Sequence, residues 1–162
     1  MAIRRMSADQ TPAGQLTEAR LHDLIGYQLA QARIATTAVF DREVGGPDGL
    51  RPVEYTLLSL IAENPEVSSA RLAKALAVTK PNITMWVDRL EARKLLQRLP
   101  SPTDKRAVVL KLTAAGARLA GRATARLIQG ERDSMSALSM AERAMLIELL
   151  HKVARSRPQG PS

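Results

Sequence analysis

Two short amphipathic stretches, 68–76 and 79–90, follow one another with only a tight turn between them. In the first stretch Ser68 is the expected helix N-cap, and Leu72 and Leu76 are spaced to lie on one buried face. The second stretch carries an N-cap, a first-turn proline and a buried stripe, namely Thr79, Pro81, Ile83, Val87 and Leu90. Two short helices joined by a turn of this length form a helix-turn-helix, which limits the fold more than any other segment does.

The residues after Leu95 change to an extended pattern. Short runs at 96–99 and 107–112 flank the segment from Pro100 to Arg106, which carries two prolines and several charges. This spacing predicts a β-hairpin with a basic tip. A further helix is expected from Pro52 to the Asn64-Pro65 stop. Helix, helix, turn, helix and basic hairpin make the layout of a winged helix-turn-helix.

Long helical stripes flank this lobe on both sides. The segment from Thr17 to Val44 spaces apolar and small residues by fours and threes and ends at the breaker cluster 45–49, which predicts a loop. Thr113 is expected to cap an Ala-rich helix, and Ser139 with Glu142 forms a capping box for a last helix. The terminal stripes exceed what one small lobe can bury, so we expect a dimer held by the terminal helices. These stripes contain Leu21, Ile25, Gln28, Ala32, Ala35 and Val39, and then Leu146, Leu149, Leu150 and Val153.

The sequence therefore predicts a mostly α fold with a small β-wing, built from a winged helix-turn-helix lobe plus a helical dimerisation region. The expected division is a flexible N-terminal arm (1–15), an N-terminal dimerisation helix (16–49), the winged helix-turn-helix lobe (50–113), C-terminal dimerisation helices (114–155) and a flexible tail (156–162). At 162 residues the chain is too short for two independent domains of ordinary size.

Positive charge is concentrated in one third of the chain. The formal net charge is +8, and residues 68–122 contain twelve Lys or Arg against three acids, so the rest of the chain is nearly neutral. Such asymmetry indicates a polyanionic partner for that segment. A basic surface kept for solubility would give the same count, and charge alone does not separate the two interpretations.

Several classes of chemistry find no support. Cysteine is absent, which excludes disulfides, thiol nucleophiles and cysteine-ligated metals. The two histidines, His22 and His151, lie far apart without metal-ligand spacing, and no nucleotide-binding fingerprint is present. We expect no enzyme activity, no metal and no cofactor. No apolar run approaches the ~18 residues of a membrane span, so the cytoplasm is the expected compartment, with nucleoid association on DNA.

The segment from Leu50 to Gly116 resembles the multiple-antibiotic-resistance regulator (MarR) family of transcriptional regulators. The resemblance rests on the blocks 69–76, 84–91, 104–106 and 110–116, whose order and spacing are more specific than any one block. It implies an obligate homodimer in which the first, fifth and sixth helices pair across a two-fold axis. It also implies that the fourth helix, which is expected over 79–90, enters the major groove of DNA.

The outward face of that fourth helix carries side chains that can bond base edges or phosphates. Met85 departs from the resemblance, which implies Arg there, and a contact with a thymine methyl is the alternative. Arg89 stands beside Asp88 and Glu91, and is equally compatible with an ion pair and with a DNA contact. The candidate DNA-binding residues are Ser69, Lys80, Pro81, Asn82, Thr84, Met85, Asp88, Arg89, Arg98, Asp104, Lys105 and Arg106.

At the hairpin tip, Asp104 can hold the guanidinium of Arg106 by charge-assisted hydrogen bonds and so orient it for a narrow minor groove. By resemblance Arg106 is the inserting residue. Lys94 departs from the family pattern, which has Gly in the turn after the fourth helix. If that turn needs a positive φ, Lys94 is strained by roughly 1 kcal/mol.

The expected function is a sequence-specific transcriptional regulator, in the first instance a repressor, that binds a pseudo-palindromic operator. The resemblance implies release by a small aromatic or phenolic ligand, for which the candidate residues are His22, Tyr27, Gln28, Gln31, Arg33 and Arg51. Gln28 could instead be a polar residue of a dimer interface, and Arg51 a surface charge. Two alternatives remain open, namely a low-specificity architectural DNA-binding protein and a winged-helix module that binds protein.

Overall fold

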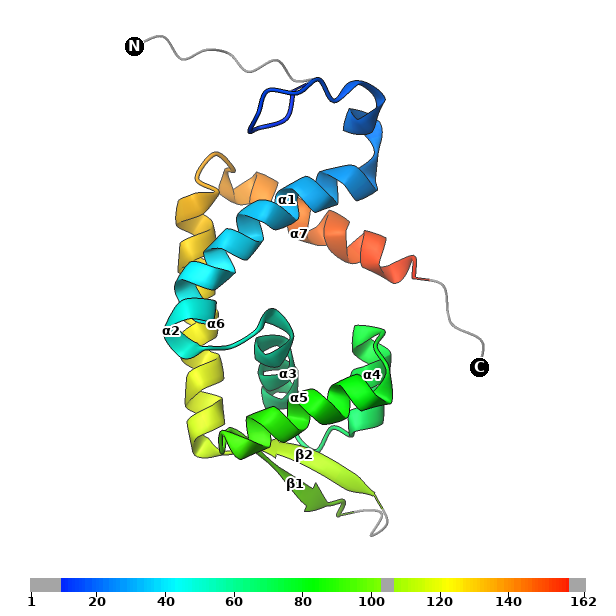
Figure 1. Cartoon of the computed structure of the whole chain (residues 1–162), viewed down its shortest axis with the longest axis vertical. Helices are drawn as coiled ribbons and strands as arrows, with labels where there is room; N and C mark the ends of the chain where they lie inside the picture. The colour runs from blue at the N-terminus through cyan, green and yellow to red at the C-terminus, as the bar shows by residue number, and fades with distance from the viewer. Residues whose placement is uncertain (1–9, 103–106, 158–162) are drawn as a thin grey trace.

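The computed structural model describes residues 10–102 and 107–157 as an α-helical chain with one two-stranded antiparallel sheet (Figure 1). This confirms the predicted fold class. The elements are the 3₁₀-helix η1 (Ala19–Asp23), α1 (Ile25–Phe40), the π-helix η2 (Asp41–Gly45), α2 (Gly46–Asp48), α3 (Pro52–Glu63), α4 (Ser69–Leu76), α5 (Lys80–Ala92), β1 (Leu96–Pro100), β2 (Val108–Leu112), α6 (Ala114–Ser134) and α7 (Met140–Arg155).

The helix-turn-helix forms as the sequence predicts. The Ser68 hydroxyl accepts a hydrogen bond from the Arg71 backbone N–H at 3.3 Å and so caps α4. Ala77 ends α4 in the left-handed region, with φ 53°, and this tight turn leads directly into α5. Thr79 occupies the N-cap position of α5, but its side chain makes no capping hydrogen bond.

The hairpin of β1 and β2, called the wing below, pairs Leu96 with Leu112 at its base and Pro100 with Val108 towards its tip. Val67, just before α4, adds an isolated bridge to Leu110. These contacts hold the wing against the helix-turn-helix. The lobe formed by α3, α4, α5 and the wing lies at one end of the molecule, and α6 leads from it towards α1 and α7 (Figure 1).

One hydrophobic core holds the lobe and joins it to α6. Leu57 and Leu58 of α3, with Ile83 and Val87 of α5, have no measurable exposure. Ala123 of α6 is also fully buried in this core. The recognition-helix candidate α5 is therefore fixed by its inner stripe, and its opposite face is free for other contacts.

The first helical segment differs from the prediction of one helix over 17–44 followed by a loop. Leu24 is extended, with φ −88° and ψ 112°, and separates η1 from α1. At the other end the chain stays helical through Gly45, Gly46 and the first-turn Pro47, and turns only at Gly49, with φ 59°. The predicted loop is wrong over most of its length because the segment packs along α6.

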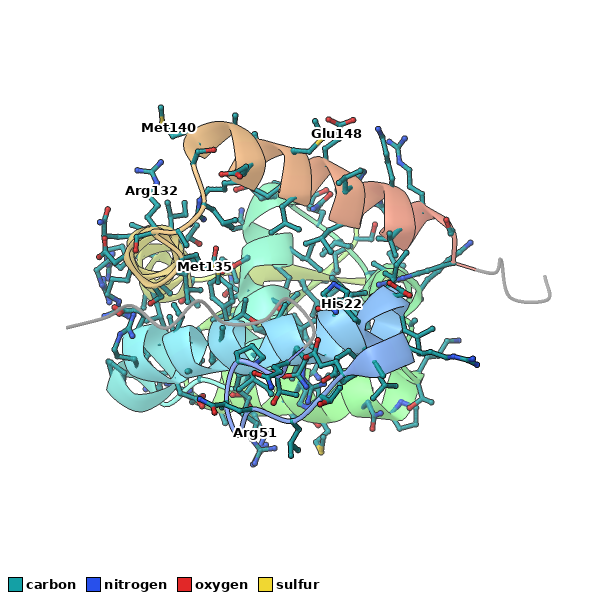
Figure 2. The ribbon with its side chains drawn as sticks, turned by 90° about the horizontal axis from the view of Figure 1, so that it is seen from above. His22, Arg51, Arg132, Met135, Met140 and Glu148 are labelled. Atoms are coloured by element: carbon teal, nitrogen blue, oxygen red, sulfur yellow. The ribbon has the colours of Figure 1, made fainter. Side chains whose placement is uncertain are left out.

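The terminal helices leave much apolar surface uncovered. No residue of α7 is buried, although Leu146, Leu149 and Val153 are spaced along one side. Figure 2 shows the side chains of Met140 and Glu148 pointing away from the rest of the molecule. An amphipathic helix with no buried residue lacks its packing partner within a single chain.

Candidate nucleic-acid interface

The outward face of α5 is the centre of the candidate interface. Its inner stripe is Ile83, Val87 and Leu90, all fully buried, and this orients the opposite face to solvent. On that face Met85 is 46% exposed. The other predicted contact residues of this helix are also exposed, namely Lys80, Pro81, Asn82, Thr84, Asp88 and Arg89, whereas Ser69 is half-buried at the start of α4.

Arg98 on β1 binds two acids of α5. Its Nη2 donates to Asp88 Oδ1 at 2.5 Å, and its Nη1 forms a very short contact with Glu91 Oε2. The Arg98 backbone N–H also donates to Glu91 Oε1 at 3.2 Å. The hydrogen bond to Asp88 raises the pKa of Arg98, and the Coulombic attraction of both acids adds to this effect. Arg98 and Asp88, both predicted to contact DNA, thus join the wing to α5.

Arg89 does not pair with its sequence neighbours. Asp88 and Glu91 both face Arg98, so an ion pair of Arg89 with either of them is wrong. Its closest acid is Glu54 of α3, with Nη1 and Oε1 3.8 Å apart. Glu54 is 5% exposed and also accepts a hydrogen bond from the Arg51 backbone N–H at the start of α3. The Arg89 side chain stays 46% exposed beside α5.

The turn after α5 contains the strained lysine that the sequence suggested. Lys94 has φ 58°, in the left-handed region. Its carbonyl accepts a hydrogen bond from the Thr113 hydroxyl at 2.8 Å, which ties the turn to the start of α6. The wing tip with Asp104, Lys105 and Arg106 lies outside the described residues, so its predicted roles stay predictions.

Among the described residues of the segment 68–126, the basic side chains divide into two groups. Arg89, Arg93, Arg98 and Arg126 bind protein acceptors, and the pairing of Arg126 with Asp48 sets it apart from Arg118 and Arg122 on the same helix. The cations of this segment with no partner among residues 10–102 and 107–157 are Arg71, Lys74, Lys80, Lys94, Lys111, Arg118 and Arg122.

A corner at Asp48 and Gly49 connects three parts of the molecule. Arg126 of α6 pairs with the Asp48 carboxylate. Arg93, at the end of α5, donates to the carbonyls of Asp48 at 2.8 Å and of Gly49 at 3.0 Å. The end of α5 is therefore anchored to the segment that links α1 to the lobe. Sequence reasoning missed this role of Arg93, because its partners are backbone carbonyls more than 40 residues away.

A groove of about 540 Å³ lies between α1, α3 and α6. Its aromatic walls are Phe40 and Tyr55, whose ring centroids are 6.0 Å apart. The Tyr55 hydroxyl is hydrogen-bonded to Thr124 at 2.9 Å and is thus held in place. The groove, called the α1–α3–α6 groove below, is lined by Arg33, Thr36, Thr37, Phe40, Pro52, Tyr55, Thr56, Leu127 and Glu131.

Of the predicted ligand residues, Arg33 alone lines this groove, while Arg51 precedes Pro52 at its edge. In residues 10–102 and 107–157 the Arg33 side chain has no ion-pair partner. The sequence analysis missed Phe40 and Tyr55. Their rarity could have drawn attention to them as candidate ligand residues, because the chain has a single Phe and only two Tyr.

The remaining predicted ligand residues gather elsewhere, around Glu18. This carboxylate is 6% exposed and contacts His22 Nδ1 at 3.2 Å and the Tyr27 hydroxyl at 3.1 Å. Desolvation raises the pKa of Tyr27, and its hydrogen bond to Glu18 raises that pKa further. Gln28 donates to the His22 carbonyl at 2.8 Å, and the side chain of Gln31 opposes the rise in the pKa of Tyr27. His22 and Arg51 lie on separate elements (Figure 2).

Residues 10–102 and 107–157 offer neither a membrane-spanning helix nor a three-residue metal site. No helix there is both long and apolar enough to cross a membrane. The same residues contain no group of three His, Asp or Glu side chains placed to hold a metal ion.

Comparisons with known proteins agree with the winged helix-turn-helix geometry. Residues 48–107 match the model of the MarR family. The HTH-type transcriptional repressor NicR of Pseudomonas putida is 32% identical over 154 residues, which cover 93% of this chain and 97% of that protein. This relative matches over nearly its full length, including the terminal helices.

Two solved structures extend the comparison. The transcriptional repressor CouR, bound to a 23-mer DNA duplex, is 29% identical with a TM-score of 0.77, over 87% of this chain and 99% of that one. Bordetella bronchiseptica BpsR, whose DNA binding is regulated by 6-hydroxynicotinic acid, is 25% identical with a TM-score of 0.73, over 83% and 96%. The chain thus belongs to the MarR family of DNA-binding transcriptional regulators, which are not enzymes.

Proposed function

We propose that the protein is a homodimeric repressor that binds a pseudo-palindromic operator and leaves it when a small aromatic acid enters the α1–α3–α6 groove. Bound to its operator, it is associated with the nucleoid. The observation that carries this proposal is a groove with aromatic walls and an unpaired arginine. The groove lies between α3 of the DNA-binding lobe and the helices α1 and α6.

The dimer follows from uncovered apolar surface. Ile25 on α1 is 64% exposed and Ile147 on α7 is 62% exposed, and neither helix covers the other. Large exposed apolar side chains that recur along a helix mark an interface. A second copy supplies the same two helices across a two-fold axis, so each apolar face meets its equivalent. Deleting residues 139–162 should therefore give monomers with little affinity for DNA, measured by sedimentation velocity, and a stable dimer of this variant would contradict the arrangement.

A two-fold dimer places two copies of α5 on one side of the duplex. The half-site centres should then lie about one helical turn, ~10 base pairs, apart. Footprinting on DNA upstream of the gene checks this spacing, and protection of one asymmetric half-site would argue against it. Competitor titration separates a regulator from an architectural protein, because a regulator keeps ~10³-fold or more preference for its operator.

The groove suits an aromatic carboxylate. The Arg33 guanidinium carries N–H donors that can bind a carboxylate in bidentate fashion. The rings of Phe40 and Tyr55 can pack against the aromatic ring of the same ligand. On the α6 side Glu131 can accept a hydrogen bond from a hydroxyl or ring N–H of the same ligand. 6-Hydroxynicotinic acid, which regulates DNA binding by BpsR, combines these groups. NicR and CouR are repressors.

The position of the groove explains how a ligand could release DNA. The groove is bounded by α3, which belongs to the lobe, and by α1 and α6. Helix α1 carries exposed apolar surface, and α6 leads on to α7, which carries the rest of it. The end of α5 is tied to the Asp48–Gly49 corner by Arg93. A ligand that changes the angle between α3 and α1 therefore also moves the two α5 helices of the dimer relative to each other.

Fluorescence anisotropy with labelled operator DNA tests the release. Benzoate, 4-hydroxybenzoate and 6-hydroxynicotinate are titrated into the complex, and at least one should dissociate it at micromolar to millimolar concentration. The variant Arg33→Gln should bind operator like the wild type but resist release. Arg20→Gln, which changes a basic residue on η1 outside the groove, is the matched control. Equal release of the wild type and Arg33→Gln would refute the role of the groove.

A further inference from the structure

Met85 lies on the outward face of α5. At about 100° of rotation per residue, its direction lies roughly 170° from the centre of the buried stripe Ile83, Val87 and Leu90. Pro81, one turn earlier, is exposed on the same side. The outward face of the first half of α5 therefore carries an exposed apolar pair. The other exposed residues over 80–88 are polar or charged, namely Lys80, Asn82, Thr84 and Asp88.

The polar neighbours of Met85 are partly occupied within the protein. The Thr84 hydroxyl donates to the Lys80 carbonyl at 3.1 Å, so its hydrogen is not available to a base. The Asp88 carboxylate accepts a hydrogen bond from Arg98 on the wing, with Oδ1 and Nη2 2.5 Å apart. These internal contacts take donors and acceptors away from the centre of the face and leave the exposed Met85 thioether there.

The major-groove edge of a base pair has one apolar feature, the C5 methyl group of thymine. We propose that Met85, flanked by Pro81, reads the methyl group of one thymine in each operator half-site. The inference rests on the proposed operator binding and adds the chemistry of one base position. A flexible, polarisable thioether packs well on such a methyl group, and it cannot donate to guanine or adenine as a cation or amide would.

The experiment begins with selection of tight-binding duplexes from a random pool by the full-length wild-type protein. In the selected operator, each thymine is replaced in turn by deoxyuridine, which removes only the methyl group. At one thymine per half-site, this change should weaken binding about fourfold, the ~0.8 kcal/mol of one buried methyl-sized group. The same change in both half-sites should weaken binding about 15-fold in anisotropy titrations.

Two variants assign the effect to Met85. Met85→Ala should bind the thymine and deoxyuridine operators with affinities within about 1.5-fold of each other, because the methyl contact is gone. Met85→Leu should keep most of the discrimination, since it retains an apolar side chain of similar size. Both should unfold at the wild-type temperature by circular dichroism, because Met85 is outside the core.

Three outcomes would overturn the inference. Wild-type affinity that changes less than twofold at every deoxyuridine position would exclude a methyl contact. Full discrimination by Met85→Ala would assign the contact to another residue. Selection that enriches no sequence would instead refute the proposed operator binding itself, and the inference with it, so the two failures are distinguishable.

Discussion

Replacing Gly116 by alanine should push α6 away from Leu95, the residue just before β1 of the wing, and so destabilise the protein. A Cβ at this position would lie 1.9 Å from the carbonyl oxygen of Leu95 and 2.8 Å from its carbonyl carbon. Both are backbone atoms, and ordinary contacts between non-bonded heavy atoms are about 3.5 Å or more. The two segments must move apart by more than 1 Å. The Leu95 carbonyl also accepts from the Thr113 N–H at 3.1 Å, so the cap of α6 is disturbed as well.

The magnitude follows from three opposing contributions. Overpacking costs about 1–3 kcal/mol, a disturbed N-cap costs about 1 kcal/mol, and the better helix propensity of alanine returns about 1 kcal/mol. The net loss is therefore about 2 kcal/mol, which for a chain of this size lowers Tm by roughly 4–8 °C. Thermal unfolding followed by circular dichroism at one fixed protein concentration measures it, because a dimer's Tm depends on concentration.

The same helix provides the matched control. A Cβ at Gly121 meets nothing within 4 Å. Gly121→Ala should therefore stabilise the protein by about 0.5–1 kcal/mol through helix propensity alone. If Gly116→Ala unfolded at or above the wild-type temperature, or if both variants lost stability equally, the close packing of α6 on Leu95 would be refuted.

Three other predictions follow from single residues. Lys94→Gly should stabilise the protein by about 1 kcal/mol, because glycine has no penalty at φ 58°, and Lys94→Ala should give no such gain in the same unfolding assay. Hydrogen bonds from the side chain and backbone of Ser139 lower the pKa of Glu142 below its ordinary 4.5. Its stabilising contribution is thus complete above pH ~4.5 and is lost as pH falls through the lower folded-state pKa; Glu142→Gln should flatten the Tm profile in that acid range. At the wing tip, Arg106→Ala should weaken operator binding by ~1–3 kcal/mol. Asp104→Ala should also weaken binding despite the gain in net charge, and anisotropy should show the double variant little worse than Arg106→Ala.

The elements of the lobe could be predicted from sequence because their signals are local. The N-caps Ser68 and Thr113, the capping box at Ser139 and the start of α3 at Pro52 each act within one helical turn. The strand ends follow from the prolines around the wing tip. None of these features depends on a contact between distant segments, so a single sequence contains enough information to place them.

The first helical segment could not be predicted in this way, because tertiary packing overrides local preference there. Gly45 and Gly46 are poor helix formers, yet both remain helical up to Gly49. The π-helix η2, which contains Glu43 and Gly45, lies so close to α6 that a Cβ at Gly130 would come within 2.7 Å of the Glu43 side chain. The glycine on the opposite helix permits this approach, and nothing in the local sequence of 41–49 reveals it.

The sequence also did not reveal which basic residues bind acceptors within the protein. These internal partners reduce the number of cations in the basic segment that are available to DNA. The sequence counts twelve cations over 68–122, but Arg93 and Arg98 bind acceptors within the protein, and Arg98 neutralises two acids. A guanidinium already held by carboxylates releases few counterions when DNA binds. The salt dependence of operator affinity, about 0.9 per neutralised phosphate, should then follow only the unpaired cations that face the duplex, such as Lys80. The internal pairs serve a different purpose, because Arg98 fixes α5 against the wing and Arg93 fixes the end of α5 against the Asp48–Gly49 corner. Together they set the orientation in which the free cations of α5 meet the phosphates.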